Sequence, residues 1–225
     1  MNTVWIVIAA YNEAGRIAEV ISGLKKCGYR NILVVDDGSS DGTQEKAQRA
    51  GALCISHEIN RGQGAALQTG IAVALKFGAG YIVTFDADGQ HNPNEIKNLL
   101  SPVQQGKTDV ALGSRFLKEG SNVPWFKKIV LKGGILFTWI FSGIKLTDAH
   151  NGFRVFSRHA AQKIRIRQDR MEHASEIIEE IRKKRLSYVE IPVTIKYTEY
   201  SIQHGQSPLN SIRIAINMII RKFMR

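Results

Sequence analysis

Short apolar runs alternate with segments of helical periodicity through the first half of the chain, and this alternation restricts the fold more than any other feature. The runs are rich in Val and Ile and are bounded by turn residues, as is typical of strands buried on both faces. They lie at residues 4–10, 32–36, 81–85 and 110–113, with 52–56 as a weaker fifth candidate. Between them, residues 17–24 and 67–75 have helical spacing. The pattern predicts an α/β, Rossmann-like domain with a mostly parallel sheet flanked by helices.

The second half of the chain has a different texture. Residues 121–147 mix aromatic side chains with lysines, and the isoleucines at 177–181 indicate a helix that ends in a basic run. Residues 189–195 alternate apolar and polar, which predicts a half-exposed strand, and Pro192 favours an edge position. Residues 210–225 predict an amphipathic helix, with isoleucines and Phe223 on one face and arginines on the other.

Composition excludes several classes of protein. Hydrophobic residues make up 44% of the 225 residues and charged residues 23%, which is a globular mixture and not a disordered one. Cys27 and Cys54 are too few for a disulfide scaffold and indicate a reducing, cytosolic setting. The apolar stretch at 133–144 is shorter than the ~20 residues that a membrane-spanning helix needs. The net charge of +11 indicates an anionic partner: nucleic acid, an acidic membrane surface or a phosphorylated substrate.

Polar side chains follow four of the predicted strands. In an open parallel sheet, ligands bind beyond the carboxyl ends of the strands, so these side chains are expected to gather at one rim. They are Tyr11, Asn12 and Glu13; Asp36 and Asp37; Asp86, Asp88 and Gln90; and Ser114 and Arg115.

Asp86 and Asp88 indicate a metal site. Two carboxylates this close repel each other unless a cation lies beside them. Mg²⁺ or Mn²⁺ takes one or two carboxylates and completes its shell with phosphates and water, and Gln90 offers a further oxygen. The alternative is a simple turn, because Asp and Gly favour turns. The preceding buried strand and the other rim residues favour the metal.

The segment after the second strand offers a cap and a ligand group. Asp41 is suited to cap the next helix, whereas Asp37 is suited to bind a nucleobase or a ribose hydroxyl. Residues 60–64 open another helix, so their amides are expected to face an anion. They form a degenerate GxGxxG in which Leu67 replaces the third glycine, and this does not indicate a dinucleotide site.

Together these motifs resemble the family 2 glycosyltransferases of the GT-A fold, and among them the dolichyl- and polyprenyl-phosphate sugar synthases. The resemblance covers roughly residues 4–197 in consistent order. The matching segments are AYNE (10–13), VDDGSSDGT (35–43), NRGQGA (60–65), DADGQH (86–91), GSR (113–115), DAHNGFR (148–154) and EIPV (190–193).

The resemblance implies roles for individual residues. Asp88, Arg115 and Glu176 would be catalytic, and Asp86, Asp88 and Gln90 would hold Mg²⁺ or Mn²⁺. His173 and Glu176 stand where some members place a catalytic acid, with a solvated helix face as the alternative. The residues that would bind the nucleotide sugar are Ala9, Tyr11, Glu13, Asp37, Asp86, Ala87, Asp88 and Arg115.

The resemblance also implies a single domain over 1–225. Residues 1–115 would be the nucleotide-sugar and metal half, 116–200 the acceptor half and 208–225 a C-terminal amphipathic helix. The late loop departs from the family, because Tyr197-Thr198 and Ser207-Pro208 stand where arginine and lysine are usual. His204 or residues 205–207 would have to replace that basic contact with the diphosphate.

The implied reaction is inverting, metal-dependent sugar transfer from a GDP- or UDP-linked donor to a polyprenyl or dolichyl phosphate or to a glycan. A lipid phosphate needs no general base, whereas a sugar hydroxyl would require one, with Glu176 or Asp148 as candidates. One alternative is a sugar-phosphate nucleotidyltransferase, but no basic glycine-rich loop follows the first strand. Another is a non-catalytic nucleic-acid-binding protein, but the acidic rim would repel phosphates.

The expected setting is the cytoplasmic face of a membrane. The basic amphipathic segment at 210–225, the aromatic and lysine-bearing segment at 121–147 and the net charge of +11 favour peripheral binding to acidic lipid. Packing of that helix on its own domain or on a partner subunit is the alternative, so a homo-oligomer remains open. No nucleic-acid partner is expected.

Overall fold

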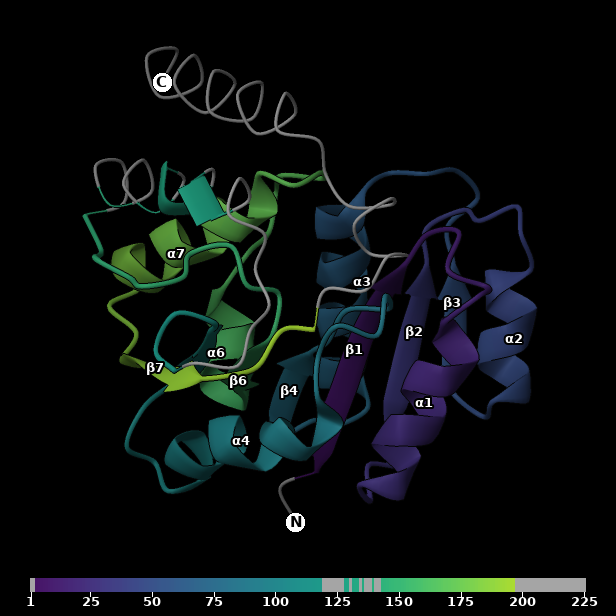
Figure 1. Ribbon diagram of the computed structural model, residues 1–225, viewed down its shortest axis with the longest axis horizontal. Helices are drawn as coiled ribbons and strands as arrows, with labels where there is room; N and C mark the ends of the chain where they lie inside the picture. Colours follow the sequence, from purple (N-terminus) through teal and green to yellow (C-terminus); the bar gives the residue numbers. More distant parts are fainter. Residues whose placement is uncertain are drawn as a thin grey trace.

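The computed structural model describes residues 3–118, 128–129, 131–133, 135, 139 and 143–196. In this part of the chain a seven-stranded sheet has the order β3-β2-β1-β4-β6-β5-β7 (Figure 1). The strands are β1 (Val4–Ala10), β2 (Ile32–Asp36), β3 (Leu53–Ser56), β4 (Tyr81–Thr84), β5 (Val110–Ser114), β6 (Arg154–Ser157) and β7 (Tyr188–Pro192). The helices are α1 (Ile17–Lys26), α2 (Thr43–Arg49), α3 (Gln63–Lys76), α4 (Ile96–Gln104), α6 (Arg158–Lys163) and α7 (His173–Lys183), and a 3₁₀ turn (Pro93–Glu95) precedes α4.

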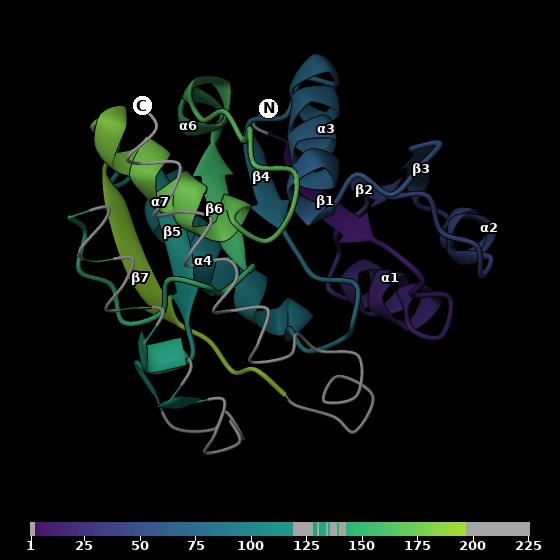
Figure 2. The same cartoon turned by 90° about the horizontal axis from the view of Figure 1, so that it is seen from above.

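Helices cover both faces of the sheet, as Figure 2 shows. Val7 of β1 belongs to a core shared with α3, α6 and α7, while its neighbours Ile6 and Ile8 belong to a second core shared with α1 and α4. Alternate residues of one strand therefore enter different cores, which is why the strand is apolar throughout. The predicted α/β class and the burial of these strands on both faces are confirmed.

The predicted strands agree closely with the observed ones. β1 and β2 have the predicted limits, β4 ends one residue earlier, at Thr84, and β5 continues to Ser114. Among the described residues β7 pairs only with β5, so the predicted edge position of the Pro192 strand is confirmed. The predicted helix at 210–225, the late-loop residues 197–208 and much of 121–147 lie outside the described residues.

β6 was not predicted, and it changes the sheet from parallel to mixed. It lies between β4 and β5 and runs antiparallel to both, so it begins at the rim where β1, β2, β4 and β5 end. The preceding residues 148–152 are thereby brought to the same rim. Its first residue is the buried Arg154, and a four-residue segment opened by arginine does not look like a central strand.

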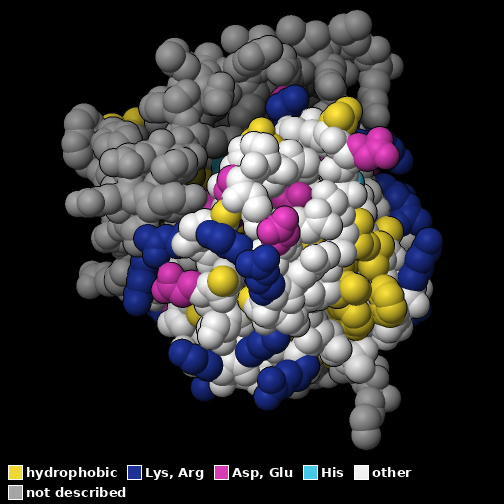
Figure 3. All heavy atoms as spheres, turned by 90° about the vertical axis from the view of Figure 1, so that its right-hand side faces the viewer, with side chains coloured by type: hydrophobic (Ala, Val, Ile, Leu, Met, Phe, Trp, Pro, Cys, Tyr) yellow, Lys and Arg dark blue, Asp and Glu magenta, His cyan; other side chains and the backbone are white. Residues whose placement is uncertain are grey.

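The surface offers no continuous basic stripe on the side that Figure 3 shows. Among the described residues, Lys and Arg side chains are spread over this face with Asp and Glu between them. No helix in the described ranges is long and apolar enough to cross a membrane.

Candidate active site

The loops that follow β1 and β2 are tied together by hydrogen bonds between backbone amides and side chains. Asn12 adopts a φ of 55°, a left-handed conformation that Asn tolerates better than most residues. Tyr11, whose exposed fraction is 50%, and Glu13 therefore stand on a fixed loop at the rim. The bonds join Asn12 N to Ser39 Oγ (2.8 Å), Ser40 N to Asn12 Oδ1 (3.1 Å), Glu13 N to Thr43 Oγ1 (2.8 Å) and Ala14 N to Asp41 Oδ2 (3.0 Å).

Asp41 also serves α2, although it is not the residue at the N-cap position. That position is Gly42, which has a φ of 85°. The predicted N-cap at Asp41 is therefore wrong, although the Thr43 amide still donates to Asp41 Oδ1 at 3.0 Å from one residue further back.

Asp37 is buried, and both of its oxygens accept hydrogen bonds from the chain. Oδ1 accepts from the His57 ring nitrogen Nδ1 (2.7 Å) and from the Arg61 amide (3.1 Å), and Oδ2 accepts from the Gly62 amide (2.6 Å). The other nitrogen of His57 lies 3.0 Å from Thr69 Oγ1. Asp37 thus fixes the 60–64 turn that opens α3, in addition to any contact with a ligand.

Asp86 follows β4 and is held from two sides. Its Oδ2 lies 2.8 Å from the buried His91 Nε2, and its Oδ1 accepts from Gln63 Nε2 at 3.4 Å. Gly152 lies against the same carboxylate, because a Cβ added there would stand 2.6 Å from Asp86 Oδ1. Burial alone would raise the pKa of Asp86, but the charge and hydrogen bond of His91 lower it overall.

Asp88 has the opposite electrostatic surroundings. Burial, and then the negative charge of Asp86, raise its pKa to about 6. Its Oδ1 accepts from the Gln90 amide at 2.9 Å, and Ala87 is buried between the two aspartates. A bound cation would stabilise the ionised form of Asp88 and offset its repulsion with Asp86.

The donor set fits a hard divalent ion. Asp86, Asp88 and Gln90 offer oxygen ligands, which Mg²⁺ and Mn²⁺ prefer. In the described part of the chain, no three His, Cys, Asp or Glu side chains are arranged to enclose a metal. An ion held by two carboxylates would therefore need ligands from elsewhere, and the phosphates of a substrate are suitable.

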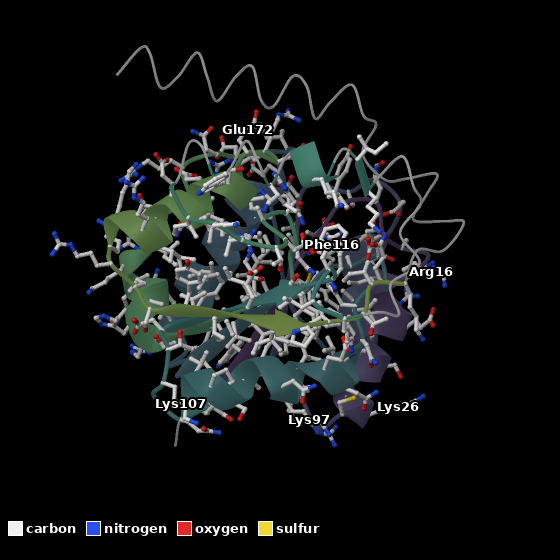
Figure 4. All side chains as sticks on the ribbon, turned by 60° about the vertical axis from the view of Figure 1, so that its left-hand side comes forward. Arg16, Lys26, Lys97, Lys107, Phe116 and Glu172 are labelled. Carbon is white, nitrogen blue, oxygen red and sulfur yellow. The ribbon has the colours of Figure 1, made fainter. Side chains whose placement is uncertain are left out.

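Arg115 and Asp148 form a buried ion pair at the end of β5. Arg115 Nε donates to Asp148 Oδ2 at 2.6 Å, and the Arg115 amide donates to the same oxygen at 3.1 Å. The side chain of Asp148 is only 1% exposed, and its Oδ1 is buried with no hydrogen-bond partner among the described residues. Phe116, the next residue, is half-buried, and Figure 4 labels it near the middle of the view, with Lys97 and Lys107 at the lower edge.

Arg154 supplies a second buried cation behind the rim. Its side-chain hydrogen bonds all go to backbone carbonyls, those of Asn151 (3.0 Å), Ala149 (3.1 Å) and Ala174 (3.2 Å). Burial lowers its pKa to about 10, while the negative charges of Asp86 and Asp148 act in the other direction. The guanidinium remains charged at neutral pH and holds the loop before β6 onto α7.

Glu176 and His173 of α7 contact the chain itself. Glu176 Oε2 accepts from the amides of Arg167 (2.9 Å) and Gln168 (2.8 Å), so Glu176 holds the loop before α7. His173 is buried and its Nδ1 donates to the Arg170 carbonyl at 2.8 Å. Burial and then the charge of Arg154 lower the pKa of His173 to about 4. The alternative of a solvated helix face is wrong for His173.

The structure gathers the predicted strand-end residues at one rim and adds others that the sequence did not single out. His57, His91, Arg154 and Glu190 each hold a predicted site residue or its loop. Ala9 belongs to β1, where it pairs with Val35 of β2. His91, Arg154 and Glu190 lie in the matching motifs, whereas no sequence signal shows which group each would bind.

Comparison with known proteins identifies the family. The chain matches the family model of Glycosyl transferase family 2 over residues 5–165, more than half of its length. The chain belongs to glycosyltransferase family 2. The resemblance inferred from the motifs is therefore confirmed, and the chain is an enzyme of this family.

Two relatives span nearly the whole glycosyltransferase. An uncharacterized protein of Methanocaldococcus jannaschii is 40% identical over 98% of this chain and 93% of that protein. The UDP-N-acetylglucosamine–dolichyl-phosphate N-acetylglucosaminyltransferase of Methanococcus voltae is 33% identical over 97% of this chain and 96% of that enzyme.

A solved structure shows the same fold. Glucosyl-3-phosphoglycerate synthase from Mycobacterium tuberculosis, in complex with Mn²⁺ and UDP-glucose, superposes with a TM-score of 0.73 at 18% identity. The match covers 97% of this chain and 77% of that one. The mixed seven-stranded sheet is thus the GT-A fold, as expected.

Proposed function

We propose that this glycosyltransferase transfers a sugar from a nucleoside-diphosphate sugar to a polyprenyl or dolichyl phosphate, with inversion and with a divalent metal bound. The choice of a lipid phosphate as acceptor rests on the contacts of Asp148 and Glu176, the two candidate general bases. Asp148 is buried against Arg115, and Oε2 of Glu176 accepts from two backbone amides. A sugar hydroxyl needs a base, whereas a lipid phosphate is already anionic and attacks without one.

The relatives support the same substrate classes. The Methanococcus voltae enzyme is named for a UDP-N-acetylglucosamine donor and a dolichyl-phosphate acceptor. The Mycobacterium tuberculosis synthase was crystallised with Mn²⁺ and UDP-glucose, and also with Mg²⁺ and UDP. A glycan acceptor is the second candidate, and it would require Asp148 to leave Arg115, or Glu176 to act as a base while its Oε2 accepts from two backbone amides.

The proposed metal would be held by Asp86, Asp88 and Gln90. When bound, the ion neutralises charge on the departing diphosphate and acts as a Lewis acid. His91 and Gln63 orient Asp86, and the Gln90 amide orients Asp88. Asp88 would thus serve the reaction by holding the ion.

The donor's base and ribose would lie against Tyr11, Glu13 and the turn held by Asp37, because these stand beyond β1 and β2. Arg115 would stand by the transferred sugar or the acceptor phosphate, fixed in place by Asp148. Inversion follows if the acceptor oxygen attacks the anomeric carbon directly, from the face opposite the diphosphate. We place the reaction at the cytoplasmic face of a membrane, to which the enzyme binds peripherally.

The decisive experiment incubates the enzyme with UDP- and GDP-linked sugars, with undecaprenyl phosphate or a soluble glycan, and with Mn²⁺, Mg²⁺ or EDTA. Sugar transfer to the lipid phosphate that stops with EDTA supports the proposal. Transfer only to the glycan, or transfer unaffected by EDTA, overturns the acceptor or the metal assignment. A thermal-shift panel of nucleoside diphosphates identifies the donor base, because a bound ligand stabilises the native state.

A further inference from the structure

Glu190, in the middle of the edge strand β7, binds the turn that carries Asp148. Its Oε1 accepts hydrogen bonds from the Thr147 amide (2.9 Å), the Thr147 hydroxyl (2.8 Å) and the Asp148 amide (3.2 Å). Its Oε2 lies 3.0 Å from the Thr147 amide. One side chain thus satisfies consecutive amides of a turn 42 residues away in sequence.

The hydrogen bonds continue from this turn to the end of β5 in one direction. A carboxylate only accepts, so the Thr147 hydroxyl donates its hydrogen bond to Glu190. Ser114 Oγ, 2.6 Å from Thr147 Oγ1, must then donate to it. Ser114 Oγ in turn accepts from the Phe116 amide at 3.3 Å. The chain of donors therefore runs from Phe116 through Ser114 and Thr147 to Glu190.

Arg115 lies between the two ends of this network. Its neighbours Ser114 and Phe116 belong to the chain of hydroxyls, while its own amide and Nε both donate to Asp148 Oδ2. Both routes end on Glu190, one through the Thr147 hydroxyl and one through the Asp148 amide. In the parallel β5–β7 ladder, Glu190 pairs with Leu112. This register places Glu190 close to the end of β5, where Ser114 and Arg115 lie.

We propose that Glu190, acting through Thr147 and Asp148, is the positioning residue that fixes Arg115 at the rim of the active site. The proposal rests on the proposed function for what Arg115 contacts, but not for how Arg115 is held. Oε1 accepts three of the hydrogen bonds to Glu190. A neutral acceptor oxygen at the position of Oε1 should therefore serve nearly as well as the charged carboxylate.

The variants follow from this geometry. Glu190→Ala removes the acceptor, whereas Glu190→Gln keeps an oxygen that can take the place of Oε1. Thr147→Val removes only the hydroxyl that links Ser114 to Glu190. Because Thr147 is exposed, this variant should fold even if Glu190→Ala does not. The matched control is Glu45→Ala, on α2, where the side chain is 72% exposed.

The first measurement reports on Arg115 without any assay of activity. The Nε–H signal of Arg115 in a ¹⁵N correlation spectrum, assigned by its loss in Arg115→Lys, should exchange slowly with solvent in the parent protein. Glu190→Ala and Thr147→Val should accelerate this exchange, while Glu190→Gln and Glu45→Ala should not. Equal protection of Arg115 in the parent protein and in Glu190→Ala overturns the proposal.

The second measurement connects position to reaction, with undecaprenyl phosphate as acceptor and UDP-N-acetylglucosamine as donor. We expect Glu190→Ala to lower kcat/KM by about 10- to 100-fold, as removal of an outer supporting residue does, with UDP affinity unchanged. In an Arg115→Lys background the same change should have little further effect. Additive losses would show that Glu190 acts independently of Arg115 and would overturn the proposal. If the parent protein transfers no sugar from any UDP- or GDP-linked donor, the proposed function fails, and the exchange measurement still decides how Arg115 is held.

Discussion

Asp86 and Asp88 differ in their surroundings although only one residue separates them. His91 lowers the pKa of Asp86, whereas burial and the Asp86 charge raise the pKa of Asp88 to about 6. The negative charges of the two carboxylates repel each other. A cation bound to an oxygen of each would neutralise this repulsion.

Asp88→Asn tests this arrangement. The change removes an anionic ligand, so we expect Mn²⁺ affinity to fall and kcat to drop by on the order of 100-fold or more, as when one electrostatic stabiliser is lost. The melting temperature should not fall, because like-charge repulsion with Asp86 disappears. Calorimetric Mn²⁺ titration in the presence of UDP provides the readout. Near-parental activity at saturating donor would contradict the metal assignment.

Asp37→Ala should act mainly on the donor. Asp37 holds the Arg61 and Gly62 amides, so its loss should loosen the turn beside the donor and raise the donor KM more than it lowers kcat. Leaving buried donors unsatisfied should also cost about 1–3 kcal/mol of stability. His57→Gln keeps both amide bonds and should have a smaller effect. Unchanged UDP affinity in Asp37→Ala would contradict the role.

His173 should remain neutral throughout the physiological pH range. Burial and the charge of Arg154 lower its pKa from 6.5 to about 4. The Arg170 carbonyl and the carboxylates of Asp86 and Glu172 act in the opposite direction and raise it, but by less. The folded protein then binds fewer protons than the unfolded chain, so stability falls as pH drops from 6.5 toward 4. Ring ¹⁵N shifts that stay constant from pH 8 to 5.5 would confirm this, with the exposed His159 as the comparison. An imidazolium signal at pH 7 would contradict it.

The sequence could place those rim residues that directly follow a strand recognisable as an apolar run. Asp86 and Asp88 could be placed because a parallel sheet aligns strand ends. His57 could not, because its contact with Asp37 depends on how β3 turns back toward α3. Glu190 could not either, because its partners lie 42 and 43 residues away.

At the level of elements, β6 marks the limit of the sequence pattern. The apolar runs reveal strands that are buried and long enough, such as β1 and β2. β6 has four residues and begins with an arginine whose charge is satisfied by backbone carbonyls, an arrangement that no periodicity encodes. Its antiparallel direction is nevertheless what brings Asp148 and Gly152 to the rim.

Gly152→Ala tests the contact between the loop before β6 and the metal ligands. A Cβ at this position would stand 2.6 and 2.8 Å from the two oxygens of Asp86, so the carboxylate must move. We expect weaker Mn²⁺ binding and lower activity while the fold persists. Gly15→Ala is the matched control, because its Cβ would meet nothing within 4 Å. Equal Mn²⁺ affinity in the two variants would show that Asp86 does not need its present position.

At the scale of the whole molecule, the charge of +11 needs a partner. The basic side chains form no continuous stripe on the face shown in Figure 3, and the rim itself is acidic at Asp86 and Asp88. The described side chains on this face therefore lack the basic stripe of a nucleic-acid-binding surface. The basic, amphipathic sequence at 210–225 suits the interface of an acidic bilayer, where a lipid-phosphate acceptor would be found.

Flotation with liposomes tests the membrane prediction. The enzyme should float with vesicles that contain anionic lipid at low salt, remain at the bottom with neutral vesicles, and detach as salt screens the attraction. Deletion of residues 210–225 should weaken flotation, because it removes apolar side chains and arginines together. Replacing only the arginines of this segment by glutamine should reduce binding to anionic vesicles while the apolar stripe stays. If the full chain ignores anionic vesicles, and the deletion alters only oligomeric state or solubility, the segment packs on protein and a soluble glycan becomes the better acceptor.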